Sequence, residues 1–322
     1  MKSYRNALCV LLLSVSTLAG TANAASAEQA DRWKPPVNSR WQYQLAGDLE
    51  HRKTGGVDVE ICGQLPSGGE CLRPQVFDID LYADLNVVDN NTTLNTAAVA
   101  QIHQNGGKAI CYVDAGGIEN FRPDYKQFTD WHTAHGNSLI GNPYPDFPDE
   151  RFANINGAEQ RAFLLEMTEA RVQKCVQAGF DGVEFDVVNT HEADQELDDA
   201  TGKPKNVSGW LITPENQLIF NRALADLGHR YNLAVGLKND LSQIDELQPA
   251  FDFAINESCS QYEECDALKP FVANNKPVYQ VEYDSSPGND PWRFCAEAAA
   301  NNFNAIKKNE DQQLLAPFTP CR

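Results

Sequence analysis

The sequence predicts an α/β fold, a single (β/α)8 barrel of the TIM type. Short apolar runs of strand length alternate along the chain with longer segments that have helical periodicity. This alternation yields eight strands, the number that closes such a barrel. Acidic residues recur in the C-terminal halves of the runs, which is the end where barrel enzymes carry their active sites.

The expected strands are rich in β-branched and aromatic residues, as strands buried on both faces are. They span residues 41–45, 76–82, 108–116, 182–188, 234–240, 253–258, 277–284 and 303–309.

Helical segments separate most of these strands. Residues 92–107 end on two glycines, which suit a helix C-terminus. Residues 159–180 repeat apolar side chains at three-and-four spacing, and residues 213–232 open on a Thr213 cap with Pro214 at the first helical position. The longest insertion-like loop expected is 191–210, and no internal repeat is found.

The N-terminus predicts export. Lys2 and Arg5 precede an apolar run, and Ala22–Asn23–Ala24 provides small residues at a cleavage site, so residues 1–24 are typical of a secretory signal peptide. Residues 25–40 are then a short N-terminal segment and residues 41–322 the barrel domain. No later run approaches the roughly 18 apolar residues of a spanning helix. The protein is expected to be secreted or periplasmic.

Eight cysteines remain besides Cys9, an even number that favours disulfides in an oxidising compartment. Close spacing suggests one bridge from Cys62 to Cys71 and another from Cys259 to Cys265. A third, between Cys295 and Cys321, would tie down the C-terminal tail. Cys111 and Cys175 are left either paired or buried as small apolar side chains. The chain has no C-x-x-C pair, and no zinc or other cofactor is predicted.

The formal charge of −19 argues against a nucleic-acid partner, because phosphates need a basic surface. It favours a cationic substrate, although acidity by itself also serves solubility.

The strand acids point more sharply to a site. In "GVEFDVVN" the alternation of side chains puts Glu184 and Asp186 on one face of a buried strand. Lys238 is the obvious basic companion on a strand, so these acids need a cation, shared protons or a positively charged substrate. The acids in the C-terminal halves of the expected strands, or just beyond them, are Asp78, Asp80, Asp114, Glu184, Asp186, Asp240, Glu257, Glu282 and Asp284.

Seven stretches, in order, resemble the endo-α-1,4-polygalactosaminidases of glycoside hydrolase family 114. They cover nearly all of residues 41–284 and read "WQYQLAGDLE", "VFDIDLYAD", "KAICYVDAGGIENFRPD", "GFDGVEFDVVNT", "LAVGLKND", "FAINESCSQYEEC" and "KPVYQVEYD". The resemblance implies a (β/α)8 barrel that cleaves α-1,4-linked galactosamine polymers, with Asp186 and Glu257 as the essential acids. Members typically read D-P-D-N-V-D where this chain has Val187 and Asn189, and the loop at 190–211 is longer, which affects substrate range more than chemistry.

Glycosidases use two carboxyl groups, one protonated and one ionised. We therefore assign Glu257 as acid/base and Asp186 as nucleophile or charge stabiliser, with Glu184 holding Asp186 or binding a sugar hydroxyl. The remaining residues expected at the substrate are the acids that would bind ammonium groups, Lys238, and three tyrosines that offer stacking faces. They are Asp78, Asp80, Asp114, Glu282, Lys238, Tyr43, Tyr112 and Tyr283.

Two alternatives use the same acids. A non-catalytic protein would capture a cationic polysaccharide without cleaving it, and a metal-dependent hydrolase would hold Ca²⁺ or Mg²⁺ between the carboxylates. Asp186 and Glu257, which match the two essential acids of the family, are both present, and this favours the enzyme. The expected partner is the polysaccharide alone, and the chain is expected to act as a monomer.

Overall fold

The computed structural model describes residues 31–84, 92–145, 147–283, 291–309 and 314–322. The chain divides into two units, Met1–Asp31 and Arg32–Arg322, and the fold and site below belong to the second. The expected signal peptide and Asp284 lie outside the described residues.

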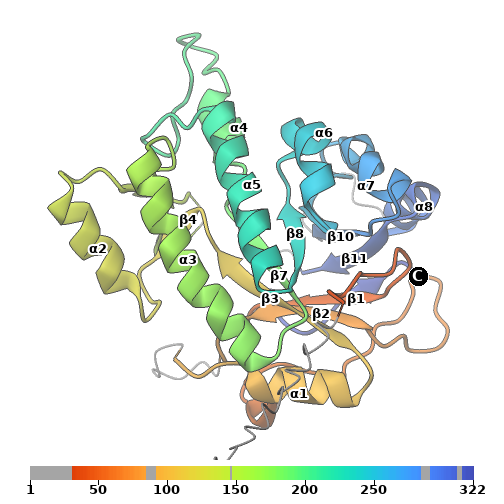
Figure 1. The fold of residues 1–322 in the computed structure, drawn as a ribbon. Coiled ribbons are helices and arrows are strands. Elements are labelled where there is room, and N and C mark those ends of the chain that lie inside the picture. Colours follow the sequence, from red (N-terminus) through yellow and green to blue (C-terminus); the bar gives the residue numbers. More distant parts are fainter. Residues whose placement is uncertain (1–30, 85–91, 146, 284–290, 310–313) are drawn as a thin grey trace, which may run out of the picture. The chain divides into compact units, whose positions relative to one another are not determined.

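A nine-stranded sheet forms the centre of the unit, with its strands in the order β1-β2-β3-β7-β8-β9-β10-β11-β12 (Figure 1). All neighbouring strands pair in parallel except β11 and β12. The eight parallel strands lie within one or two residues of the expected runs, and the α/β fold class is confirmed. The strands are β1 (Trp41–Gln44), β2 (Val76–Asp80), β3 (Lys108–Asp114), β7 (Gly182–Asp186), β8 (Ala234–Lys238), β9 (Phe253–Glu257), β10 (Val278–Tyr283), β11 (Asn304–Lys308) and β12 (Thr319–Pro320).

Within the described residues, the first and last parallel strands, β1 and β11, are not joined by the backbone hydrogen bonds that close a regular barrel. Instead the Lys308 ammonium donates to the Gln42 side chain at 3.0 Å, and the Leu45 amide donates to the carbonyl of Leu314 at 3.1 Å. Side chains and the C-terminal segment thus connect the sheet edges.

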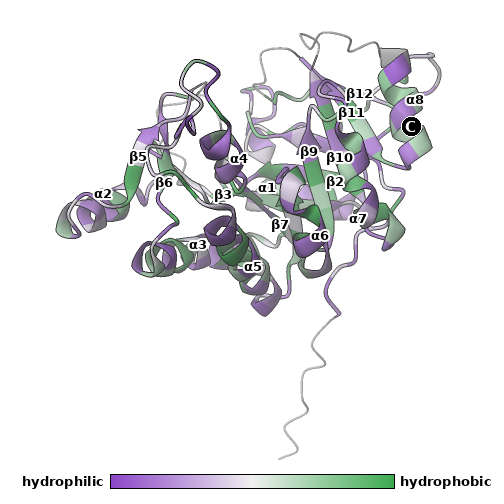
Figure 2. Ribbon diagram, turned by 90° about the horizontal axis from the view of Figure 1, so that it is seen from above, coloured by the Kyte–Doolittle hydropathy of each residue, from purple (hydrophilic) through white to green (hydrophobic). Residues whose placement is uncertain are grey.

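Because side chains alternate in direction along each strand, the sheet has a hydrophobic core on each of its two faces. Outward residues such as Phe77, Ile79 and Val183 pack against the helices. Inward residues such as Trp41, Phe253 and Tyr279 form a separate cluster enclosed by the strands. Figure 2 shows hydrophobic residues on the strands and a mixture of hydrophobic and hydrophilic residues along α3 (Ala158–Ala178) and α5 (Pro214–Arg230), as helices with one buried face require.

The three helical segments expected from the sequence form α1 (Thr96–Gln104), α3 and α5, and the remaining helices were not specified by the sequence pattern. Gly179 in the left-handed conformation (φ 94°) ends α3, and the Thr213 hydroxyl caps α5 by accepting the Asn216 amide at 3.3 Å. The connection after β1 holds a 3-10 turn, η1 (Arg52–Thr54), where a regular unit has a helix. The other helices between the strands are α1 (Thr96–Gln104), α3 (Ala158–Ala178), α4 (Thr190–Gln195), α5 (Pro214–Arg230), α6 (Ile244–Leu247), α7 (Lys269–Ala273) and α8 (Pro291–Asn301), with 3-10 turns η2 (Leu241–Gln243), η3 (Gln248–Ala250) and η4 (Cys265–Leu268).

The largest departure lies between β3 and α3. The expectation that 191–210 is the longest insertion is wrong, because residues 117–153 form an insert with a three-stranded antiparallel sheet. The insert contains β4 (Gly117–Glu119), α2 (Tyr125–Ala134), β5 (Ile140–Pro143) and β6 (Glu150–Ala153). Its strands are only three or four residues long and mix polar with apolar residues, so they lack the apolar runs that mark barrel strands. Figure 2 shows α2, β5 and β6 gathered at one side of the unit.

Four disulfides stabilise the fold. Cys62–Cys71, Cys259–Cys265 and Cys295–Cys321 are the expected pairs. Cys111–Cys175, which the sequence left open, joins β3 to α3. No helix among the described residues has the length and apolarity to cross a membrane.

Candidate active site

A cavity of about 490 Å³ lies at the C-terminal ends of the barrel strands and extends to the insert. Both proposed catalytic acids line it. The side chain of Asp186 is 21% exposed and that of Glu257 is 30% exposed, so each can reach a bound molecule. Tyr43, Asp80, Tyr112 and Lys238 complete the set of expected residues on its surface.

The Lys238 ammonium occupies the centre of the cluster. It lies 3.2 Å from Asp186 Oδ1, 3.3 Å from Glu257 Oε2 and 3.3 Å from Glu184 Oε1. It also donates to the Tyr43 hydroxyl at 3.1 Å. Burial opposes the charged form, but the surrounding anions outweigh it and raise the pKa of Lys238 well above its ordinary value. The lysine is therefore a fixed cation that allows several carboxylates to share one site.

Asp186 is held as an anion. Burial opposes ionisation, but Lys238 and hydrogen bonds from Tyr112 and the Val187 amide outweigh it, so the pKa of Asp186 is lowered. The Tyr112 hydroxyl donates to Oδ2 and the Val187 amide to Oδ1, each at 2.8 Å. Burial and the neighbouring carboxylates keep the pKa of Tyr112 well above its ordinary value, so this hydroxyl remains a donor. An ionised, oriented carboxylate is what a glycosidase nucleophile requires.

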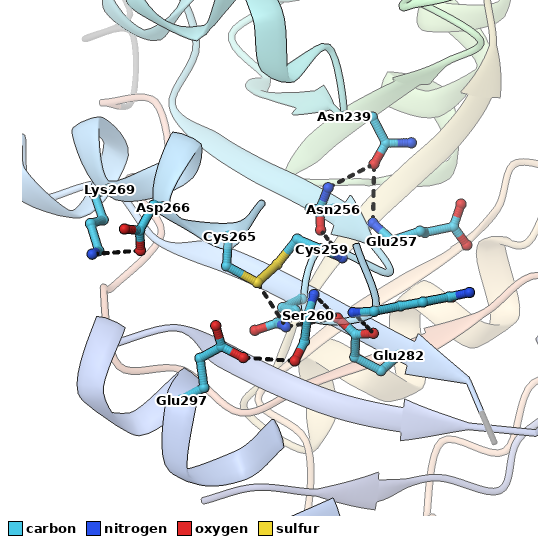
Figure 3. Close-up of a disulfide and its surroundings, with 12 residues drawn as sticks. Asn239, Asn256, Glu257, Cys259, Ser260, Cys265, Asp266, Lys269, Glu282 and Glu297 are labelled. Atoms are coloured by element: carbon cyan, nitrogen blue, oxygen red, sulfur yellow. Dashed lines mark hydrogen bonds and ion pairs between the residues drawn. A yellow bond between two sulfur atoms is a disulfide. The ribbon is translucent and has the colours of Figure 1, made fainter. Parts of the chain in front are cut away.

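Glu257 is positioned from the loop side of β9. Its backbone amide donates to Asn239 Oδ1 at 3.0 Å, and the Asn256 side chain donates to the same oxygen at 3.1 Å (Figure 3). The Tyr283 hydroxyl donates to the Glu257 carboxyl. Tyr283 itself is not part of the cavity lining and acts here through Glu257.

The loop after Glu257 is anchored twice. Ser258 adopts a left-handed conformation (φ 66°), and the Cys259–Cys265 disulfide closes a small loop directly after it. Glu282 is fully buried and accepts the Ser260 amide at 2.7 Å and the Gln261 amide at 3.3 Å, as Figure 3 shows for Ser260. Glu282 thus holds the loop from beneath and does not line the cavity.

Three further expected acids are also placed away from the cavity lining. Glu184 is fully buried, accepts the Tyr43 hydroxyl at 3.2 Å, and has its pKa raised to about 7 by burial. Asp78, also fully buried, adjoins it, and burial followed by the Glu184 charge raises the pKa of Asp78 well above its ordinary value. Asp114 is 2% exposed and accepts the Gly117 amide. Direct contact of these acids with substrate stays a prediction, and their burial favours a supporting position.

Several cavity residues were not anticipated from the sequence. Arg122 pairs with both oxygens of Asp80, at 2.8 and 2.7 Å, and with Glu119 at 2.7 Å. Tyr144 and Glu150 reach the cavity from the insert. Arg122 could have been found from the sequence, because it lies in "GGIENFRPD", directly after the expected strand that ends near Asp114. Glu150 could not, because it lies in a stretch that shows no strand pattern.

Two residue groups have donor atoms close enough for a metal among the described residues. One contains Cys259 and Cys265, whose sulfurs are joined in a disulfide and are not free thiolates. The other, His191 with Glu192 and Asp240, has ligand atoms within 4.8 Å of one another but does not line the cavity.

The chain is similar to glycoside hydrolases in sequence and in structure. The model of glycoside-hydrolase family GH114 matches residues 22–320. A crystal structure of Aspergillus fumigatus Ega3 in complex with galactosamine is similar over 90% of this chain and 98% of that chain, at 28% identity and a TM-score of 0.66. The glycoside hydrolase domain of PelA from Pseudomonas aeruginosa shares the fold at 14% identity and a TM-score of 0.51, over 88% of this chain and 98% of that one. No curated protein matches.

Proposed function

Because the chain belongs to glycoside hydrolase family GH114 and is a glycoside hydrolase, we propose that it cleaves α-1,4-linked galactosamine polysaccharides internally, with Asp186 and Glu257 as the catalytic pair. One observation carries the assignment of the pair. The two carboxylates come from β7 and β9, both reach the cavity, and both face the same Lys238 ammonium.

The spacing of the pair favours a retaining mechanism. Asp186 Oδ1 and Glu257 Oε2 lie 3.2 and 3.3 Å from one nitrogen, so the distance between these two oxygens is at most the sum of the two values. Only a straight line through the three atoms would reach that limit, which equals the shortest inverting spacing. Retaining glycosidases hold their carboxyl groups roughly 5–5.5 Å apart, and inverting enzymes roughly 6.5–9.5 Å.

The chemistry then runs in two steps. Asp186 attacks the anomeric carbon while Glu257, in its protonated form, transfers a proton to the departing glycosidic oxygen, which leaves a glycosyl ester on Asp186. Glu257, now ionised, takes a proton from a water that attacks the same carbon and releases Asp186. The Tyr112 hydroxyl and Lys238 stabilise the Asp186 carboxylate whenever it is free.

Galactosamine as the repeating sugar is supported by the ligand in the Ega3 structure and by the acidity of this chain, whose formal charge is −19. The four disulfides are consistent with an exported enzyme. We propose that it acts outside the cytoplasm as a monomer.

The decisive test is product analysis after incubation with polygalactosamine, its N-acetylated form and chitosan. Short oligomers from the first polymer, with the anomeric configuration retained, are the expected result. Asp186→Asn and Glu257→Gln should each lower the rate by about 10²-fold or more while the protein stays folded. Retention of a tenth of the activity in either variant contradicts the assignment, and if Glu184→Gln alone abolishes the activity, the nucleophile lies one layer deeper.

The same assay separates the alternatives. A binding protein yields no new reducing ends. A hydrolase with a divalent ion between the carboxylates loses activity in EDTA, whereas the proposed enzyme does not, because the Lys238 ammonium already holds the position between these acids.

A further inference from the structure

The insert contributes the acid Glu150 to the cavity lining. Glu150 begins β6 and lies directly opposite Glu119 of β4 in the antiparallel register. Glu119 has an ion-pair partner, because Arg122 donates to it at 2.7 and 2.8 Å and bridges it to Asp80. Glu150 lines the cavity, yet its Oε1 is buried with no hydrogen-bond partner among the described residues.

A second orphaned oxygen faces the same point. Asp114 is 2% exposed, and its Oδ2 also has no partner in the described part of the chain. The position that a Cβ atom on Gly117 would take lies 2.1 Å from Asp114 Oδ2 and 2.6 Å from Glu150 Oε1. The two oxygens are therefore close neighbours, and only glycine at position 117 leaves room for them.

Two carboxyl groups so placed are costly in the empty cavity. Burial, and after it the charges of Asp114, Glu119 and Asp186, raise the pKa of Glu150 to about 10, with Lys238 acting in the opposite direction. Burial and the charges of Glu119 and Asp186 likewise raise the pKa of Asp114 well above its ordinary value. In the empty cavity Glu150 is therefore protonated at neutral pH, and an ammonium group bound beside the two oxygens would take the place of that proton and leave the carboxyl ionised.

We propose that Glu150, supported by Asp114, forms a subsite that binds the ammonium group of a galactosamine unit beside the catalytic pair. The inference rests on the proposed function and adds residues that select the amine. An ammonium group offers three donors and a positive charge to two neighbouring acceptors. An N-acetyl group offers one N–H donor, no charge and additional bulk, so it leaves the carboxyls uncompensated.

Aromatic side chains next to Glu150 suit the body of a sugar. Tyr144 and Phe147 both line the cavity with ring centroids 5.9 Å apart, and Phe147 is 48% exposed although it is a large apolar residue. An exposed aromatic ring at a polar cavity offers a stacking surface for the apolar face of a sugar ring. The subsite thus combines a charged contact for the amine with an apolar contact for the ring.

The test compares Glu150→Gln with the wild-type enzyme on polygalactosamine and on its N-acetylated form. We expect kcat/KM on the amine polymer to fall about tenfold to hundredfold, as the loss of a charge-assisted hydrogen bond predicts, with a change of less than about threefold on the acetylated polymer. Asp130→Asn is the matched control, since it makes the same charge change on the insert at an exposed ion pair on α2. An unchanged ratio of the two polymers in Glu150→Gln overturns the inference.

Direct binding separates this inference from the proposed function. In the inactive Glu257→Gln background, calorimetry with galactosamine and N-acetylgalactosamine should show a preference for the amine that Glu150→Gln removes. A wild-type enzyme that hydrolyses neither polymer refutes the proposed function, whereas hydrolysis with an unaltered amine preference in Glu150→Gln refutes only the subsite. Thermal unfolding supplies the structural readout: Tm should stay equal or rise, because an unpaired buried carboxyl is removed, and a large fall in Tm overturns the assignment in favour of a structural role.

Discussion

Replacing Lys238 with methionine removes the cation that three carboxylates share while keeping a side chain of similar length. Lys238 is 2% exposed and contacts Asp186, Glu184 and Glu257 at 3.2–3.3 Å. At an effective dielectric of about 20, each such contact is of order 5 kcal/mol before desolvation is subtracted. Breaking a buried pair by removing one partner typically costs about 3–5 kcal/mol of folding free energy.

The catalytic effect follows from the state of Asp186. Lys238 is the strongest influence that lowers the pKa of this acid against burial, so its loss raises that pKa. Tyr112 still donates to Asp186, while Glu184, Glu257 and Tyr43 remain near the Lys238 position and do not replace its charge. Because Asp186, the proposed nucleophile, must be ionised, a higher pKa moves the acid limb of the kcat/KM profile to higher pH. We expect a loss of about 10²-fold at the wild-type optimum, with partial recovery as pH rises.

The assay is a pH–rate profile together with urea unfolding of the same preparations. Lys108→Met is the matched control, because the Lys108 side chain is 44% exposed and its partner Asp181 keeps the Ala109 amide as a donor, so the loss should cost less than about 1 kcal/mol. If Lys238→Met keeps more than a tenth of the activity and an unshifted acid limb, the lysine does not control the ionisation of Asp186.

Two further predictions concern the loop at Glu257 and the acidic field. Replacing both Cys259 and Cys265 with serine should lower the free energy of unfolding by about 2 kcal/mol, and it should reduce kcat because the bridged loop follows Glu257 directly. Urea unfolding and initial rates measure the two effects, and an unaltered kcat would show that the disulfide does not position Glu257. The preference for deacetylated over N-acetylated polymer should weaken between low salt and about 0.5 M, since screening shortens the reach of the −19 charge; equal salt responses of both polymers would mean that the charge serves solubility alone.

Local sequence pattern was sufficient to predict the barrel strands and the position of the acids near the C-terminal ends of those strands. Strand runs such as residues 182–188 are recognisable because buried parallel strands need apolar side chains on both faces, and an acid on such a strand is conspicuous. The pairings of Cys62 and of Cys259 were predictable for a related reason, since their partners are close in the chain.

The insert and its site residues required the tertiary structure. Strands β4–β6 are short and partly exposed, so residues 117–153 carry no strong periodic signal. Glu150 acquires its significance only because the sheet of the insert sets it opposite Glu119 and beside Asp114. Cys111 and Cys175 likewise become partners only when α3 packs on β3.

By itself, the sequence determined which strands carry acids, because side-chain alternation is a property of each strand taken alone. Only the tertiary structure decided which of those acids line the cavity. Glu184 and Asp186 share one face of β7, yet the first has a fully buried side chain and the second is 21% exposed. Lys238 from the neighbouring β8 contacts both carboxyls, so depth along the strand is what separates them: Asp186 lies at the end of β7 that borders the cavity and Glu184 does not, and that depth depends on how the strands lie against one another.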